Sequence, residues 1–266
     1  MLIHATERVP GWAEGWRRTG RLVLLLDFDG TLAPIVERPE LAGMPEATRG
    51  ALERLMAMPG VEVAVVSGRG LADVRERAAI PEIAYAGNHG MEIHGPGVER
   101  IHPEAAAARP QLEEARRSIE HAIGGVPGAW VEDKLLTLSV HYRQAPRDRV
   151  PDVERAVREA AEGEPLLKVV PGKEVLEVRP RVDWHKGKAV LFLLDQMRPP
   201  AGAPVLYLGD DTTDEDAFAA LRDSGLGEGV RVIEDPSAES AATAYVRTPA
   251  EVGELFAALA EAGEDR

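Results

Sequence analysis

The sequence contains no cysteine and few aromatic residues. Of its 266 residues, 5% are aromatic and 44% are hydrophobic. The lack of cysteine excludes disulfide bonds and thiolate metal sites, and the low aromatic content predicts a core that is mostly aliphatic. A chain of this length is long enough for one large domain or two modest ones.

Positively charged residues are also scarce, because the chain has 31 Lys and Arg but 45 Asp and Glu, which gives a formal net charge of −14. This balance argues against a nucleic acid or an anionic membrane as partner. No apolar run approaches the roughly 20 residues of a membrane span. The N-terminus shows no basic region followed by an apolar stretch. We therefore expect a soluble, cytoplasmic protein, and we expect it to be a monomer whose partner is a small molecule.

Short apolar runs alternate with amphipathic segments at both ends of the chain. Apolar spacing predicts strands at residues 22–26, 61–66, 83–86, 205–208 and 230–233. It predicts helices at residues 47–58, 71–79, 186–196, 215–222 and 251–262. Strands that alternate with helices imply a parallel sheet covered on both faces.

The middle of the chain has a different order, in which each of two helices precedes a pair of strands. The helices are predicted at 105–123 and 150–161, and the strands at 129–132, 135–142, 166–170 and 175–179. This order suggests an open antiparallel sheet with helices on one face. We therefore predict a Rossmann-like α/β core at residues 1–102 and 181–266, with an inserted α/β domain at 103–180. Hinges are expected at Gly95-Pro96-Gly97 and at residues 180–183.

Polar clusters follow four of the predicted core strands. In an open parallel sheet, ligands bind beyond the carboxyl ends of the strands. Each cluster alone is compatible with an ordinary loop, but four at one edge indicate a binding site. The clusters are Asp27-Phe28-Asp29, Ser67-Gly68-Arg69, Gly87-Asn88-His89-Gly90 and Gly209-Asp210-Asp211.

The first cluster suits a magnesium-dependent phosphoryl transfer site. Asp27 is the expected nucleophile, and Asp29 is the expected acid/base, which protonates the leaving oxygen and later activates water. A lone aspartate is more often a helix cap or turn residue, but Gly30, which lets the backbone pass close to a phosphate, favours the catalytic interpretation. Thr31 either positions Asp29, donates to phosphate, or is an ordinary helix-start hydroxyl.

The last cluster supplies the expected metal ligand. Magnesium prefers oxygen ligands, with one or two carboxylates beside phosphate and water. The Asp27 carboxylate, the Asp29 main-chain carbonyl and Asp210 would meet this preference, and Asp214 would orient waters on the metal. The same acidic stretch is a weaker candidate for calcium, because it lacks the loop glycine and twelfth-position glutamate of an EF-hand.

Ser67 and Lys186 complete the predicted catalytic set. Ser67 is expected to hydrogen-bond the transferring phosphoryl group, near a helix N-terminus that favours anions. Lys186 would neutralise the pair formed by the aspartate and the phosphate. The ordinary alternative for Lys186 is a solvated lysine at the start of a helix.

In this order, the motifs resemble those of the haloacid dehalogenase (HAD) superfamily of aspartyl-phosphate phosphatases, and the insert resembles the C2-type cap of that superfamily. The closest resemblance is to the trehalose-6-phosphate phosphatase family. It rests on Ser67-Gly68-Arg69, Gly87-Asn88-His89-Gly90-Met91-Glu92-Ile93, Glu132-Asp133-Lys134, His141-Tyr142-Arg143, Gly172-Lys173-x-x-x-Glu177-x-Arg179-Pro180 and Gly209-Asp210-Asp211-Thr212-Thr213-Asp214-Glu215.

The resemblance implies an Mg²⁺-dependent enzyme that releases trehalose and phosphate from trehalose 6-phosphate, with a cap that excludes water and selects the sugar. It implies that the substrate is bound by Thr31, Arg69, Asn88, His89, Glu132, Lys134, Arg143, Lys173 and Glu177. Strand alternation is compatible with this role, since Ser139, His141 and Arg143 share a face opposite Leu138 and Val140. Without the resemblance, a solvated sheet face would be the commoner interpretation.

The same motifs are also compatible with other functions. One is a phosphatase of the sucrose or mannosyl-3-phosphoglycerate type, and another is a sugar phosphomutase, which would need a bisphosphate activator. A third is a non-catalytic sugar-phosphate sensor. The combination of Asp27, Asp29 and Lys186 argues against the sensor, because a pure binder needs no nucleophile with an acid/base.

Overall fold

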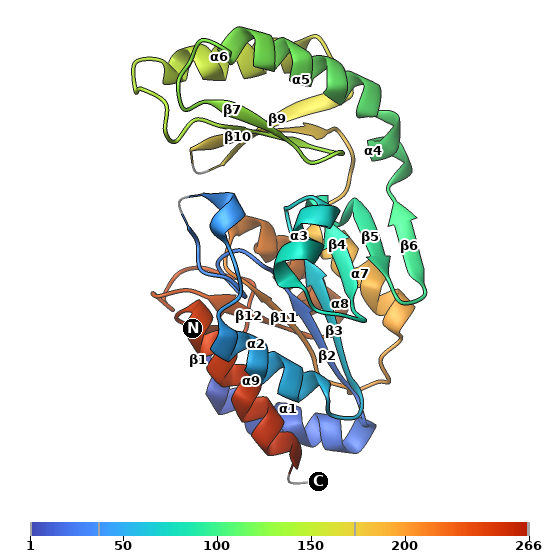
Figure 1. The fold of residues 1–266 in the computed structure, drawn as a ribbon. Coiled ribbons are helices and arrows are strands. Elements are labelled where there is room, and N and C mark those ends of the chain that lie inside the picture. Colours follow the sequence, from blue (N-terminus) through green and yellow to red (C-terminus); the bar gives the residue numbers. More distant parts are fainter. Residues whose placement is uncertain (1, 37, 173, 265–266) are drawn as a thin grey trace. The chain divides into compact units, whose positions relative to one another are not determined.

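The computed structural model describes residues 2–36, 38–172 and 174–264, which pack as two compact units (Figure 1). The first unit contains Met1–Gly68, Ala72–Glu99 and Trp184–Arg266, and the second contains Arg69–Leu71 and Arg100–Asp183. The limits near residues 100 and 183 lie within three residues of the predicted ones. The short segment Arg69–Leu71 packs with the second unit, which the sequence did not indicate.

The first unit is built on a sheet that has nine strands within the described residues. Its order is β1 (Ile3–His4), β13 (Ala244–Val246), β12 (Glu228–Val232), β11 (Val205–Gly209), β2 (Leu22–Leu26), β3 (Val61–Val66), β4 (Ala84–Gly87), β5 (Glu92–Gly95) and β6 (Val98–Ile101). Neighbours from β1 to β4 are parallel, and β5 pairs with β4 antiparallel. The predicted α/β class with a parallel core sheet is confirmed.

Helices lie on both sides of this sheet (Figure 1). On one side, α7 (Lys186–Met197) and α8 (Glu215–Ser224) share a hydrophobic cluster with Val23, Leu25 and Tyr207. On the other, α1 (Ala5–Thr19) and α2 (Glu46–Met56) both pack on α9 (Pro249–Glu264). The short helix α3 (Leu71–Ala78) follows β3. All five residues of β2 are buried, as expected for a strand covered on both faces.

Several elements have no counterpart in the sequence prediction: β1, α1, β5, β6 and β13. The expected hinge at Gly95-Pro96-Gly97 was wrong, because Pro96 and Gly97 form the turn between β5 and β6. Gly97 has a φ of +71°, a conformation that suits glycine in a tight turn. Among the helices of the described residues, none is long and apolar enough to cross a bilayer.

The second unit contains an antiparallel sheet in the order β7 (Trp130–Asp133), β8 (Leu138–His141), β10 (Val175–Pro180) and β9 (Leu167–Gly172). Helices α5 (Arg109–Ile123) and α6 (Val150–Glu162) pack on one face, against Leu138, Val140, Leu176 and Val178. The predicted helix at 105–123 is divided into α4 (Pro103–Ala107) and α5, because Pro110 fits only the first turn of a helix.

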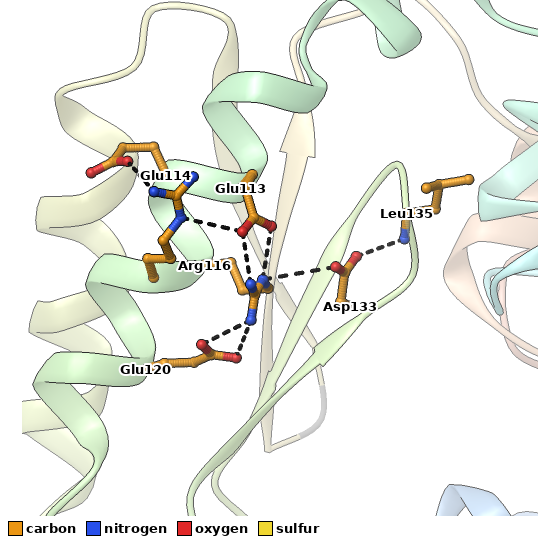
Figure 2. A network of polar contacts seen from close by, with 7 residues as sticks. Glu113, Glu114, Arg116, Glu120, Asp133 and Leu135 are labelled. Carbon is orange, nitrogen blue, oxygen red and sulfur yellow. Dashed lines mark hydrogen bonds and ion pairs between the residues drawn. The ribbon is translucent and has the colours of Figure 1, made fainter.

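A network of charges ties α5 to the turn between β7 and β8 (Figure 2). Arg116 Nη2 lies 2.7 Å from Glu113 Oε1, its Nη1 lies 2.7 Å from Glu120 Oε1, and its Nε lies 3.8 Å from Asp133 Oδ2. The backbone N–H of Leu135 donates to Asp133 Oδ1 at 2.8 Å. The turn that carries Lys134 is therefore held at its base by a side chain of the helix.

Candidate active site

The strand order brings the four polar clusters to one edge of the sheet. β11, β2, β3 and β4 are parallel neighbours, so their carboxyl ends lie side by side. The backbone N–H of Asp27 donates to the carbonyl of Leu208 at 2.9 Å, which joins the ends of β2 and β11. Residues 27 and 210, far apart in sequence, thereby start their loops from adjacent strands.

Lys186, the first residue of α7, lies between two of the predicted carboxylates. Its Nζ donates to Asp27 Oδ1 at 2.7 Å and to Asp214 Oδ1 at 2.6 Å, and all three residues are buried. Burial alone would lower the pKa of Lys186, but the charges of Asp214 and Asp27 outweigh it and raise the pKa above its usual value. The lysine is therefore an ammonium that fixes both carboxylates, and the solvated-lysine alternative does not hold.

Asp214 is completely hydrogen-bonded. Its Oδ1 accepts from Lys186 and from the hydroxyl of Tyr207 at 2.6 Å, and its Oδ2 accepts from the backbone N–H groups of Asp210 at 3.0 Å and Asp211 at 2.9 Å. A carboxylate used in this way holds its neighbours in place. Tyr207 was missed in the sequence, although a phenol inside the buried run of β11 signals a hydroxyl that needs a partner.

The residues present fit a divalent cation. Carboxylate oxygens of Asp27, Asp210 and Asp214 lie within 4.8 Å of one another. Ionised, the three carboxylates and Lys186 sum to −3 + 1 = −2. Asp210 Oδ1 is buried and has no hydrogen-bond partner within the described residues. Because Asp214 is already saturated, Asp27 and Asp210 are the carboxylates that would hold the ion.

The pKa values of the Asp27 and Asp210 carboxyls are raised by burial and by the other carboxylates of the cluster. Burial raises the pKa of Asp210 to about 7, and the negative charge of Asp214 adds to this effect. Burial also raises the pKa of Asp27 well above its usual value, while Lys186 opposes the shift. A bound cation would favour the ionised forms of both groups.

The loop after β2 folds tightly next to Asp210. The N–H groups of Leu32 and Ala33 donate to the carbonyl of Phe28 at 2.9 and 2.8 Å. Gly30 has a φ of +78°, and a Cβ added to it would lie 2.1 Å from Asp210 Oδ2. Only glycine therefore fits this position without displacing Asp210.

Asp29 and Thr31 flank this glycine. Asp29 is partly buried, and its carboxylate does not belong to the cluster formed by Asp27, Asp210 and Asp214. The Thr31 hydroxyl is buried and has no hydrogen-bond partner within residues 2–36, 38–172 and 174–264. A buried hydroxyl of this kind is expected to meet a ligand or water.

The loops after β3 and β4 are tied together. Ser67 is buried, and its carbonyl accepts the N–H of His89 at 2.8 Å. The His89 ring packs on Gly68, where an added Cβ would lie 2.7 Å from the ring. Asn88 is fully buried and donates to Glu92 Oε2 at 2.9 Å. These contacts give Asn88 and His89 structural roles, and their substrate-binding roles stay predictions.

The second unit brings three predicted substrate residues, Glu132, Lys134 and Glu177, together on the sheet face opposite the helices. Glu132 bonds His141 at 2.8 Å, and Glu177 Oε1 accepts from Lys134 at 3.2 Å and from Ser139 at 3.3 Å. Arg179 also pairs with Glu177. We call this set the polar-face cluster: Glu132, Lys134, Ser139, His141, Glu177 and Arg179.

Arg69 and Arg143, which were also predicted to bind the substrate, are not part of the polar-face cluster. Burial acts to raise the pKa of Glu132, but the hydrogen bond with His141 and the charges of Lys134 and Arg69 hold that pKa below its usual value. Arg69 thus acts on the cluster through its charge. Arg143 pairs with Glu174 at 3.2 Å. Lys173 lies outside the described residues.

Comparison with known proteins gives consistent matches. The trehalose-phosphatase family model matches residues 25–250. The chain is 44% identical over 240 residues to the trehalose-phosphate phosphatase of Mycobacterium tuberculosis (strain ATCC 25618 / H37Rv). The aligned region covers 89% of this chain and 61% of the relative. It is 40% identical over 269 residues to the trehalose-phosphate phosphatase of Mycobacterium avium (strain 104), and this alignment covers 98% of this chain and 67% of the relative. The chain therefore spans about three fifths of the length of the first of these relatives.

Solved structures agree. The C-terminal domain of the C. albicans trehalose-6-phosphate phosphatase matches with a TM-score of 0.77 and 25% identity, over 95% of this chain and 96% of that one. A trehalose-6-phosphate phosphatase from Aspergillus fumigatus matches with a TM-score of 0.65 and 29% identity, over 98% and 99%. With the family model covering most of its length, the chain belongs to the trehalose-phosphatase family.

Proposed function

We propose that this protein is an Mg²⁺-dependent phosphatase that hydrolyses trehalose 6-phosphate to trehalose and phosphate. The observation that carries the proposal is Lys186, whose ammonium bridges Asp27 and Asp214 beside Asp210, an aspartate whose Oδ1 has no hydrogen-bond partner in the part of the chain that the structure describes. This arrangement supplies a fixed nucleophile, a fixed positive charge and two carboxylates for a cation. Membership of the family and the similarity to named trehalose-phosphate phosphatases support the substrate.

The proposed reaction has two displacement steps at phosphorus. An Asp27 carboxylate oxygen attacks phosphorus in line, the bond to the sugar oxygen breaks, and Asp29 gives that oxygen its proton. Asp29, now a carboxylate, removes a proton from a water that attacks phosphorus, and phosphate leaves Asp27. Lys186 holds Asp27 in place and offsets the charge of the phosphoryl group. A divalent cation on Asp27 and Asp210 would supply further neutralisation of phosphate oxygens.

The remaining predicted residues are proposed to bind the substrate. Ser67 and the buried hydroxyl of Thr31 suit phosphoryl oxygens. The second unit, proposed to be a C2-type cap, would select the sugar through the polar-face cluster and through Arg69, Arg143 and Lys173. In that cluster two carboxylates are paired with Lys134, Arg179 and His141. Such a balanced set of donors and acceptors suits uncharged hydroxyls better than a phosphate.

The test is phosphate release from trehalose 6-phosphate, sucrose 6-phosphate, mannosyl-3-phosphoglycerate, glucose 6-phosphate and mannose 6-phosphate. With Mg²⁺ present, we expect kcat/KM for trehalose 6-phosphate to exceed that for each other substrate by at least about 100-fold, because hydroxyls bonded by a built site discriminate strongly. Chelation with EDTA should abolish release, and added Mg²⁺ should restore it.

The outcomes separate the alternatives. Preference for another sugar phosphate would leave the chemistry intact and discard the trehalose assignment. Turnover that needs a bisphosphate activator would indicate a phosphomutase, and trehalose 6-phosphate binding without release would indicate a sensor. Release that persists unchanged in EDTA would contradict the metal dependence.

The Tyr207 hydroxyl provides a second test, because it donates to the Asp214 oxygen that also accepts from Lys186. In Tyr207→Phe this oxygen keeps only the lysine, and Asp214 is held less firmly. We expect kcat to fall about tenfold, since the loss of one charge-assisted hydrogen bond costs on the order of 1.5 kcal/mol. Steady-state kinetics with trehalose 6-phosphate measures the effect.

Tyr85→Phe is the matched control. Tyr85 is also buried, and its hydroxyl donates to the Ile80 carbonyl at 2.8 Å, away from the catalytic carboxylates. Both variants should lose a similar amount of stability, but only Tyr207→Phe should lose activity. Equal kcat values for the two variants would show that Tyr207 acts only on stability.

A further inference from the structure

An exposed aromatic ring borders the polar-face cluster. Trp130, at the start of the edge strand β7, is 43% exposed, although the chain is poor in aromatic residues and buries most large apolar side chains. It lies directly opposite His141 in the antiparallel pair of β7 and β8. The side chains of a directly opposed pair stand on the same face of a sheet. Trp130 is therefore on the polar face, away from the core formed by α5 and α6.

The indole ring is held rigidly in this position. It stacks on the His141 imidazole with ring centroids 4.2 Å apart and an angle of 16° between the planes. His141 is itself fixed by its 2.8 Å hydrogen bond to Glu132. Because one face of the indole is covered by His141, its exposed surface lies on the other face and on the ring edge. The result is a flat apolar surface next to charged donors and acceptors.

Rigid aromatic surfaces beside paired carboxylates and cations suit a pyranose ring. The C–H groups of a pyranose form an apolar face that packs on an aromatic ring, while its hydroxyls need hydrogen-bond donors and acceptors around the rim. Glu132 and the Lys134–Glu177 pair supply such groups on the same sheet face. A phosphate would gain nothing from the indole, so the surface favours the sugar part of a sugar phosphate.

We propose that the exposed face of Trp130 stacks on a pyranose ring of the substrate and is a specificity determinant of the enzyme. The inference rests on the proposed function, since it assumes a sugar phosphate as substrate. Trp130 makes no contact with the reacting bond in this proposal. It contributes to sugar binding, and its removal should therefore affect KM rather than kcat.

The test compares Trp130→Ala and Trp130→Phe with the wild type on trehalose 6-phosphate and on p-nitrophenyl phosphate, which has no sugar. We expect Trp130→Ala to raise KM for trehalose 6-phosphate about tenfold, the effect of a lost aromatic stacking contact, with kcat changed by less than about twofold. Trp130→Phe should keep most of the affinity. The kcat/KM for p-nitrophenyl phosphate should be the same in all three proteins.

Leu166→Ala is the matched control, because Leu166 belongs to the same unit and is 44% exposed. It should leave KM unchanged, which separates stacking from a general loss of apolar surface. As a binding measurement, trehalose should change the tryptophan fluorescence of the wild type but not that of Trp130→Phe. Equal KM values for the wild type and Trp130→Ala, with active wild type, would overturn the stacking proposal alone. A wild type inactive on trehalose 6-phosphate would overturn the proposed function, and the trehalose titration would then decide on Trp130.

Discussion

Asp27→Asn is expected to reduce phosphate release from trehalose 6-phosphate by at least about 10⁴-fold, as in other enzymes that lose a covalent nucleophile. The amide has the shape of the carboxylate, but its oxygen is a poor nucleophile and would weaken the hold on a cation. Lys186 keeps its 2.6 Å hydrogen bond to Asp214, so the rest of the site should stay assembled. Single-turnover kinetics with the purified variant measures the loss.

The same substitution should not destabilise the metal-free protein. Burial raises the pKa of Asp27 well above its usual value in the folded state. An acid with a raised folded pKa lowers stability as pH rises from its unfolded pKa through its folded pKa. A neutral asparagine removes that cost, but it also removes one of the two negative charges that stabilise the buried ammonium of Lys186, so the Tm in EDTA at neutral pH should lie close to that of the wild type.

Asp216→Asn serves as the control for this variant. Asp216 is exposed in the first turn of α8 and lies outside the three grouped carboxylates. It should retain full activity. Full activity in Asp27→Asn would eliminate Asp27 as nucleophile, whereas an inactive and unfolded Asp27→Asn would contradict the stability argument.

Gly30→Ala is expected to lower activity at least about 100-fold, because precise placement of catalytic groups carries effects of this size. The added methyl would lie 2.1 Å from Asp210 Oδ2, and the backbone φ of +78° is unfavourable for alanine. Asp210 must turn away, so its place beside Asp27 is lost. The Mg²⁺ concentration needed for half-maximal activity should rise together with the loss of rate.

Backbone strain alone is tested by Gly20→Ala. Gly20 has a φ of +72° at the end of α1, and an added Cβ would have nothing within 4 Å. This variant should lose about 1 kcal/mol of stability and no activity. If Gly20→Ala and Gly30→Ala were equally active, contact with Asp210 would have no importance for the site.

Much of the core could be predicted because its strands are continuous apolar runs. β2 and β3 have the predicted limits, and each is followed directly by a polar cluster at the same edge of the sheet. The N-terminal helix α1 escaped prediction because Pro10, Gly11 and Gly15 have low helix propensity. Its buried residues Val9, Trp12, Ala13 and Trp16 nevertheless repeat at helical spacing. The strands β1 and β13 contain too few residues for a pattern to appear.

The residues proposed for the site could be named from the sequence, but the contacts among them could not be predicted. Asp27, Lys186, Asp210 and Asp214 could be named because each stands beside a strand end or a helix start. Their mutual hydrogen bonds depend on tertiary packing, and so does the saturation of Asp214. The stacking of Trp130 on His141 depends on the register between β7 and β8, which single-strand patterns do not specify.

The position of β2 between β11 and β3 has a consequence for folding while the chain is being synthesised. Lys186 is hydrogen-bonded to Asp27, which lies 159 positions before it in the sequence, and to Asp214, which lies 28 positions after it. β2 emerges early from the ribosome, but its neighbour β11 is synthesised only after the whole second unit. Closing so long a loop is slow, and until then one edge of a fully apolar strand stays unpaired. A nascent chain that stops before Asp210 carries the proposed nucleophile, Asp27, without the proposed metal ligand Asp210, so on this proposal neither hydrolysis nor metal binding is expected before β11 has docked.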